Sequence, residues 1–215
     1  MTESELDTTR FFKEIGVDLN RIAEGTEKTP DFYFETGAQK VFVEVKEIKE
    51  NEDEKKLLRD VEIYGQTGVH DSPELGKRFR PAIQAANRQL KQRCLSGEAG
   101  LIIIQDVRDW FTRSIVPQEE IKIAMFGDRI TWICVNSRTV KADLYDKNKT
   151  TTEMKNTTVS AIGLLIKNVQ DNSLSLHVYH NPHAKNALVS TVFFSDRVFE
   201  YRIFDTKAYG DFKRV

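Results

Sequence analysis

The sequence has few cysteines and no long apolar run, and each shortage excludes a class of protein. Its two cysteines, Cys94 and Cys134, are too few and too far apart for a disulfide framework or a zinc site of their own. No apolar stretch approaches the ~20 residues that a membrane-spanning helix needs. The acidic, polar N-terminus fits no signal peptide. We therefore expect a soluble, cytoplasmic protein with free thiols and no membrane contact.

The chain also has no large excess of either charge, because 32 Lys and Arg residues nearly balance 33 Asp and Glu residues, with a formal net charge of −1. No overall positive field attracts nucleic acid, although a local basic patch can serve that purpose. Apolar residues make up 40% of the chain and charged residues 30%, as in globular proteins. With 215 residues, no internal repeat and no clear linker, we expect one domain over residues 1–215.

A hairpin of two short strands is predicted from Asp31 to Lys46. Apolar and polar residues alternate on both sides of Gly37-Ala38, as in strands with one buried face. With these two residues as the loop, Asp31 lies directly opposite Glu44, and opposed residues have Cβ atoms roughly 4.5–5.5 Å apart. Alternation places the two acids and Lys46 on one face and the valines on the other. Opposed carboxylates repel, so the pair favours a cation between them, and oxygen ligands suit Mg²⁺ or Mn²⁺.

The same residues resemble a known motif. Pro30-Asp31, thirteen residues before Glu44-Val45-Lys46, resembles the PD-(D/E)xK core of the restriction-endonuclease-like nucleases. The resemblance implies metal-dependent hydrolysis of nucleic acid, with DNA the expected substrate and Mg²⁺ the expected cofactor, for which Mn²⁺ can substitute. It makes Asp31, Glu44 and the backbone carbonyl of Val45 metal ligands, and Lys46 the group that orients or activates the attacking water. Restriction-type nucleases frequently dimerise, so a homodimer stays open, although no interface is predicted.

The tripeptide acid-x-Lys is a weak signal by itself, because it occurs eight times in the chain. Only the copy at Glu44 lies in a β-branched strand with a Pro-Asp at hairpin distance. An ordinary amphipathic hairpin with a charged solvent face is the alternative. Two other functions therefore stay open. One is a nuclease fold that has lost catalysis and binds nucleic acid or protein, and the other is an unrelated α+β interaction protein.

The remaining pattern predicts an α+β fold whose element order resembles the αβββαβ core of that superfamily. This core is a mixed central sheet flanked by helices, here with extra C-terminal strands. The long polar segment 47–76 is predicted to be a mobile flap beside the site, with simple disorder as the alternative, and 136–158 is predicted to be a loop. Apolar spacing predicts helices over 3–16, 77–93 and 117–126, and strands over 100–106, 130–135, 160–167, 173–180 and 197–204.

The resemblance also adds an acid from the first helix. Members of the superfamily often supply one there, and Glu5 has the matching spacing from the glycine that ends the helix. Such a carboxylate would complete a metal shell or hold a second ion. The rivals are Glu3, Glu14 and Glu24, and an exposed helix acid is the alternative for each of the four.

The predicted helix over 77–93 carries six positive charges and no acid. Arg and Lys side chains contact the phosphodiester backbone without reading its sequence, so this helix is a candidate nucleic-acid surface. A solvated helix face is the alternative. By the resemblance, the helix also contributes a glutamine to the site, for which Gln89 is preferred over Gln84. The candidate phosphate contacts are Lys77, Arg78, Arg80, Arg88 and Lys91.

Overall fold

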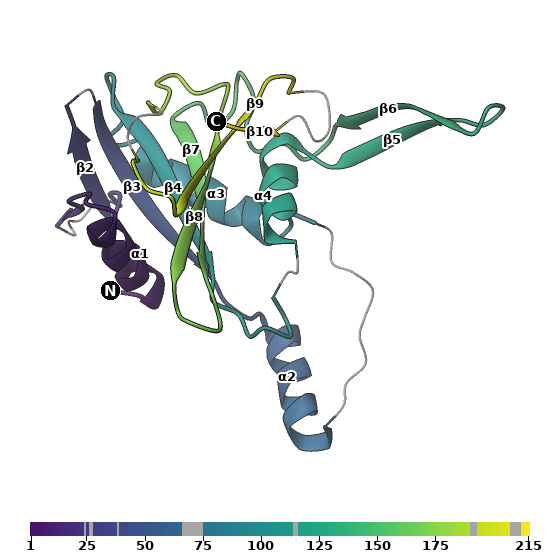
Figure 1. The fold of residues 1–215 in the computed structure, drawn as a ribbon, viewed down its shortest axis with the longest axis horizontal. Coiled ribbons are helices and arrows are strands. Elements are labelled where there is room, and N and C mark those ends of the chain that lie inside the picture. Colours follow the sequence, from purple (N-terminus) through teal and green to yellow (C-terminus); the bar gives the residue numbers. More distant parts are fainter. Residues whose placement is uncertain are drawn as a thin grey trace.

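The computed structural model describes residues 1–23, 25, 28–37, 39–65, 75–113, 116–189, 193–206 and 212–215. In this part of the chain, helices flank an eight-stranded central sheet, and a separate two-stranded hairpin projects from the body (Figure 1). The helices are α1 (Glu3–Glu14), α2 (Glu52–Tyr64), α3 (Phe79–Leu90) and α4 (Pro117–Phe126). The strands are β1 (Asn20–Arg21), β2 (Phe32–Thr36), β3 (Gln39–Ile48), β4 (Ala99–Asp106), β5 (Arg129–Cys134), β6 (Thr139–Tyr145), β7 (Val159–Lys167), β8 (Leu174–His180), β9 (Val198–Ile203) and β10 (Phe212–Arg214).

The central sheet is mixed, with the strand order β1-β2-β3-β4-β7-β8-β9-β10. Strands β3, β4 and β7 run parallel at its centre, and β2 and β8 flank them as antiparallel neighbours. Strands β5 and β6 form the second, two-stranded sheet. The predicted mixed α+β fold, with flanking helices and additional C-terminal strands, is therefore confirmed.

Two apolar layers lie on opposite faces of the sheet, and β3 contributes to both. Val43 packs in one cluster with Phe12 of α1. Phe42 packs in the other cluster with Ile83 of α3. Because side chains alternate along a strand, Glu44 follows Phe42 onto the α3 face. The predicted separation of the valines from the acidic face is therefore confirmed.

Strands β2 and β3 form the predicted hairpin. Thr36 pairs with Gln39, and the Thr36 hydroxyl accepts a hydrogen bond from the Gln39 amide at 3.1 Å. Of the predicted loop residues, Ala38 lies outside the described part of the chain. The register is set by this pairing, which leaves every later pair of β2 and β3 in the predicted alignment.

Helix α2 occupies 13 residues of the segment predicted as a mobile loop over 47–76, and β3 extends into the first two residues of that segment. The sequence of α2 is rich in charge and none of its residues is buried, although Leu57, Val61 and Tyr64 have the spacing of one helix face. Its ends stabilise it instead. Asn51 and Glu54 form a capping box, and Gly65 ends the helix in the left-handed conformation with φ +68°. The loop prediction is wrong for the helical residues, and 66–74 lie outside the described chain.

Charges attach α2 to the rest of the molecule. The Glu54 carboxylate pairs with Arg78 at 3.2 Å and with Arg108 at 2.7 Å. Arg108 is itself buried and pairs with Asp106, the last residue of β4, at 2.7 Å. One glutamate therefore connects α2 both to the start of α3 and to the end of a central strand.

Strands β6 and β10 were not predicted from the sequence. Strand β6 lies within 136–158, and the prediction of a loop there is wrong for these residues, because Val140-Lys141-Ala142-Asp143-Leu144 alternates apolar and charged residues as a strand does. It forms by antiparallel pairing with β5, with a register shift between Trp132 and Ile133. Strand β10 has three residues and pairs with β9. The three residues of β10 are too few to form a pattern, whereas the alternation in β6 is a strand signal that the prediction missed.

The cysteines are free thiols, as predicted. Burial raises the pKa of Cys94 to about 12, which makes its thiol unreactive. Of the helices within the described ranges, none is long and apolar enough to cross a bilayer.

Replacing Phe12 by alanine tests the packing of α1 on the sheet. Phe12 is fully buried, and its ring centroid lies 5.7 Å from that of Phe34 and 5.9 Å from that of Phe193. We expect Phe12→Ala to lower the free energy of unfolding by about 3–5 kcal/mol, measured by urea denaturation. Leu6→Ala, on the exposed side of the same helix, should change it by less than about 0.5 kcal/mol. Equal losses would contradict the assignment of the buried face.

Candidate active site

The hairpin brings the two predicted acids together. Phe32 lies opposite Val43, so Asp31, one residue before β2, lies opposite Glu44. The Asp31 carboxylate also accepts a hydrogen bond from the backbone amide of Val45, with Oδ2 and N 2.8 Å apart. This bond holds the carboxylate over β3, at the point where Glu44 leaves the strand. Asp31 and Glu44 therefore converge as the sequence predicts.

Glu44 is fully buried but only half satisfied. Its Oε1 accepts a hydrogen bond from the Lys46 ammonium, whereas its Oε2 meets no hydrogen-bond donor among the described residues. Burial, together with the neighbouring Asp31 carboxylate, raises the pKa of Glu44 to about 8. Burial also raises the pKa of Asp31. A cation between the two carboxylates would offset both penalties.

Lys46 is held from two sides. Its ammonium donates to Glu44 and to Oε1 of Gln89, the latter at 3.0 Å. The amide nitrogen of Gln89 donates in turn to the backbone carbonyl of Thr29 at 3.1 Å. The orientation of the Gln89 amide follows, because an ammonium can only donate. Gln89 is thus brought to Lys46, as preferred in the sequence analysis, while Gln84 is exposed on α3.

Lys46 can donate one more hydrogen bond than it makes. An ammonium carries three donors, and two of them are used by Glu44 and Gln89. The Lys46 side chain is 24% exposed, whereas that of Glu44 is completely covered. The third N–H of the Lys46 ammonium therefore has no hydrogen-bond acceptor among the described residues.

The first helix places Glu5 near the two acids without completing a ligand set. The charge of Glu5 contributes to the raised pKa of Asp31, and the Glu5 carboxylate lies 3.9 Å from the Arg21 guanidinium. Of its rivals, Glu3 pairs with Lys167, Glu14 pairs with Arg197 and Glu24 lies outside the described residues.

The residues fit a divalent cation that takes few protein ligands. Among the residues that the structure describes, no three His, Cys, Asp or Glu side chains are grouped to hold a metal. Mg²⁺ commonly uses one or two carboxylates and completes its shell with water and substrate phosphate. The buried, unpartnered Oε2 of Glu44 beside Asp31 matches that pattern. The carbonyl of Val45 stays a predicted additional ligand.

The basic residues of the α3 region divide into two groups. Arg78 is engaged with Glu54, and Arg80 forms an ion pair with Asp128. Both guanidinium groups are thus used within the fold, and the prediction that they contact phosphates gains no support. Lys77, Arg88 and Lys91 are exposed and make no ion pair in the described part of the chain.

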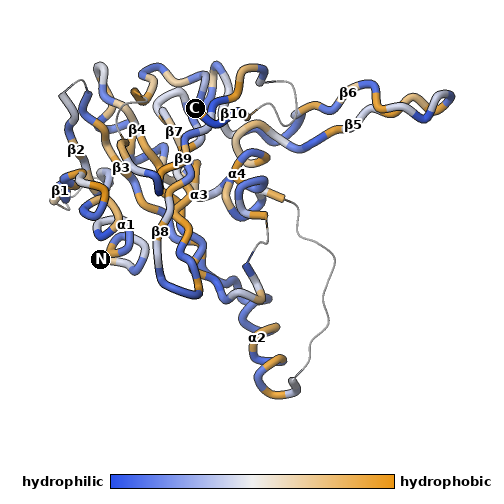
Figure 2. The backbone as a smooth tube through the Cα atoms, in the orientation of Figure 1, coloured by the Kyte–Doolittle hydropathy of each residue, from blue (hydrophilic) through white to orange (hydrophobic). Residues whose placement is uncertain are grey.

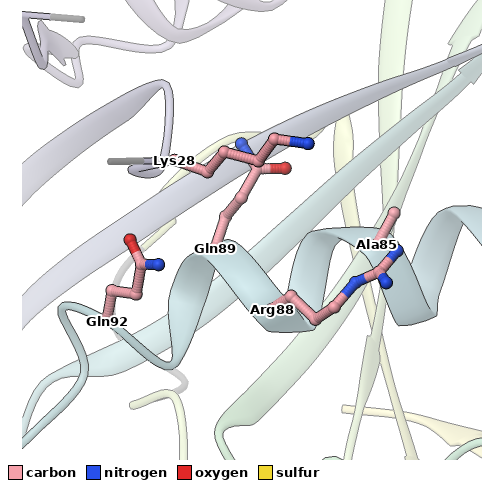
Figure 3. A pocket seen from close by; sticks show the side chains of 5 residues that line it. All are labelled: Lys28, Ala85, Arg88, Gln89 and Gln92. Carbon is pink, nitrogen blue, oxygen red and sulfur yellow. The ribbon is translucent and has the colours of Figure 1, made fainter. Parts of the chain in front are cut away.

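An open cleft of about 680 Å³ lies beside Gln89. Figure 3 shows Lys28 and Gln89 side by side, with the long side chain of Arg88 on the same helix. Of the five predicted phosphate contacts, Arg88 is the one that lines this cleft. Lys28 and Gln92 also line it and were missed. Gln92 follows Gln89 at helical spacing, which is the only sequence signal that could have indicated it.

Comparison with protein-family models, curated proteins and solved structures finds no significant match to this chain. The inferences below therefore depend on the site itself.

The pKa of Glu44 predicts how stability depends on pH. The native state keeps the Glu44 proton up to about pH 8, whereas the unfolded chain releases it near the ordinary value of 4.5. Between these values the native state binds more protons, so without metal its stability should fall as pH rises. We expect a loss on the order of 1 kcal/mol per pH unit. Glu44→Gln should remove this slope and be more stable than the wild type at pH 8.

Urea denaturation from pH 5 to pH 9 in EDTA measures the difference between the two proteins. Glu52→Gln is the control, because the Glu52 side chain is 83% exposed, and it should keep the wild-type slope. Parallel curves for wild type and Glu44→Gln would contradict the proposed strain at Glu44.

Proposed function

We propose that this chain is a metal-dependent nuclease that hydrolyses phosphodiester bonds, with DNA as the expected substrate and Mg²⁺, replaceable by Mn²⁺, as the cofactor. One observation carries the proposal. Asp31, Glu44 and Lys46 converge at one point, where a buried oxygen of Glu44 faces the Asp31 carboxylate and meets no hydrogen-bond donor in the described chain. A merely solvated hairpin face does not account for a fully buried glutamate at this position.

The acids supply the binding site. Asp31 and Glu44 would hold the cation, with Glu5 nearby to add negative charge. A bound divalent cation supplies Lewis-acid activation of a phosphoryl oxygen and of water. Because Glu44 must release its proton to act as a ligand, metal affinity should rise with pH toward about 8.

Lys46 would orient the nucleophile. Gln89 fixes the ammonium through a chain of hydrogen bonds that ends at Thr29, just before the Pro-Asp dipeptide. The donor that neither contact uses is then available to a water or to a non-bridging phosphate oxygen. Gln89 acts through Lys46, which makes it a positioning residue.

The cleft gives the substrate a place to lie. Lys28 and Arg88 supply positive charge without forming ion pairs in the described residues, and Gln92 supplies an amide. These are the side-chain types that contact phosphodiester backbones. Gln89 lines the cleft and also touches Lys46, so a strand lying in the cleft would pass directly beside the site. A cytoplasmic location agrees with the two free thiols.

A fold that binds nucleic acid without cutting it is the second candidate. Its support is the Lys46 ammonium, which already contacts Glu44 and offsets part of the negative charge of the two acids without a metal. The two candidates differ in their response to metal, because only the nuclease needs Mg²⁺ or Mn²⁺ both for cleavage and for stabilisation of the site.

Cleavage assays with supercoiled plasmid, single-stranded DNA and RNA test the activity, each with Mn²⁺ or Mg²⁺ against EDTA. Asp31→Asn, Glu44→Gln and Lys46→Met should each lower the rate by at least about 100-fold, since each removes a ligand or a proton-handling group. Mn²⁺ should also raise the melting temperature of the wild type, and raise it less in Asp31→Asn.

Matched controls exist on the same hairpin. Glu35 and Lys40 form an exposed ion pair at 2.8 Å, and Glu35→Gln and Lys40→Met should cut at the wild-type rate. No metal-dependent cleavage of any of the three substrates, with retained binding in EDTA, would favour the non-catalytic candidate. Wild-type rates in all three site variants would overturn the assignment of the site.

Arg88→Ala tests the cleft separately from the chemistry. Removing one phosphate contact should weaken nucleic-acid binding in EDTA and lower the slope of log affinity against log salt by about 1. Fluorescence anisotropy of a labelled oligonucleotide at several salt concentrations gives both quantities. Lys77→Ala, two residues before α3 and outside the cleft lining, should leave the slope unchanged. Equal effects of the two variants would show that the cleft has no special role.

A further inference from the structure

Two parts of this protein project from the body with apolar side chains uncovered. The first part, called the arm, is residues 129–145, which form β5, β6 and their connecting turn. The second part is α2 (Figure 1). Figure 2 colours parts of both orange, the hydrophobic end of its scale. The rest of the described chain makes few contacts with either part. A helix or a two-stranded hairpin of this length is usually stabilised by packing against other elements.

The arm carries apolar side chains on both faces. On one face, Trp132 lies opposite Ala142, and Ile130 opposite Leu144. On the other face, Arg129 and Asp143 form an ion pair, and Ile133 lies opposite Val140 nearer the turn. An isolated two-stranded hairpin is at best marginally stable in water. The exposed apolar side chains of the arm are thus a surface to be covered. Trp132, Ile133, Val135 and Val140 are each at least 60% exposed.

Helix α2 presents a similar problem. Leu57, Val61 and Tyr64 recur at the spacing of one helix face, and none of them is buried. Ile63 and Tyr64 are 67% and 69% exposed. A 13-residue helix without tertiary packing is marginal even with good caps. Contiguous apolar surface of this kind usually marks a site of contact with another molecule.

Charge identifies the molecule that covers them. The arm carries three basic residues and one acid, whereas α2 carries five acids and three basic residues. One of the five acids, Glu54, is already paired with Arg78 and Arg108, which leaves four acids against three basic residues on α2. The two apolar surfaces therefore have opposite net charge, and each is complementary to the other. A polyanion such as nucleic acid would be attracted to the arm but repelled by α2. Figure 1 shows the arm and α2 projecting from separate parts of the body, so they do not cover each other within one copy.

We infer that the arm of one copy packs against α2 of a second copy, and the second arm against the first α2, in a two-fold symmetric dimer. Two-fold symmetry makes each such contact occur twice, so both exposed surfaces of each copy are covered at once. The apolar side chains supply the stabilisation and the opposite charges set the register. This inference does not depend on the proposed nuclease activity, since neither element belongs to the site.

Charge reversal tests the pairing. Arg138 and Lys141 are exposed on the arm, and Asp60 and Glu62 lie on α2. We expect the wild type to approach twice its monomer mass of 24.8 kDa in sedimentation equilibrium as concentration rises. The arm variant Arg138→Glu/Lys141→Glu and the helix variant Asp60→Lys/Glu62→Lys should each have about half the wild-type mass under the same conditions.

A mixture of the two variants gives the sharpest result. In a heterodimer, the acidic arm of one variant meets the basic α2 of the other, and the basic arm meets the acidic α2. We therefore expect the dimer mass to return on mixing, and also in a single chain carrying all four substitutions. Met154→Ser, whose side chain is 94% exposed elsewhere on the surface, should dimerise like the wild type.

Several outcomes would overturn the inference. A wild type that stays at 24.8 kDa at every concentration excludes the dimer. An effect of the arm variant alone, with no recovery on mixing, would indicate that arms contact arms. A monomeric wild type whose nucleic-acid affinity falls in the arm variant would assign the arm to nucleic acid. Because mass is measured without substrate or metal, loss of the nuclease proposal leaves this test unaffected.

Discussion

The close approach of two carboxylates, forced by strand pairing, is the constraint on which the candidate site depends. Pairing of β2 with β3 sets Asp31 against Glu44, and the backbone amide of Val45 then pins Asp31 in place. Asp31 cannot turn away from Glu44 without losing its hydrogen bond from the Val45 amide. The protein compensates with Lys46, whose ammonium is turned inward toward Glu44. The resulting arrangement is stable enough to fold and still electrostatically unsatisfied, as expected of a site built to receive a cation.

Burial makes this constraint chemically useful. Glu44 lies on the α3 face of the sheet, among side chains of the second apolar layer, where a charge is weakly solvated. The same two acids on a solvated hairpin would have ordinary pKa values and little attraction for a metal. Helix α3 is therefore more than a cover for the sheet. It excludes water on one side of the site and presents Gln89 to the lysine.

The hairpin was predictable from sequence because its determinants are local. A period of two, a two-residue loop and the position of the acids relative to that loop are enough to set the register. The prediction that Gln89 belongs to the site depends on the family resemblance and on the preference for Gln89 over Gln84. The placement of these residues agrees with the structure, whereas their chemical roles stay predictions.

Some of the parts that sequence analysis missed depend on distant partners. The engagement of Arg78 and Arg80 could not be predicted, because their acidic partners lie 24 and 48 residues away. Helix α2 is stabilised by its caps and by the ion pair of Glu54 with Arg78, and its charged sequence outweighs the apolar spacing of Leu57, Val61 and Tyr64. Strand β6 pairs with β5, but its own alternation is a local signal that the prediction missed. Lys28 belongs to the cleft only because the chain returns to α3 just before the hairpin.

The ion pairs of Glu54 with Arg78 and Arg108 link α2 to the interior of the protein. Arg78, one of the two partners of Glu54, is the residue immediately before α3, and Gln89 lies near the other end of that same 12-residue helix. The second partner, Arg108, is buried, and stripping a buried ion of its partner costs about 3–5 kcal/mol. Helix α2 is consequently not a loose appendage. The side chain of Glu54 thus links the surface helix to the same α3 that presents Gln89 to Lys46.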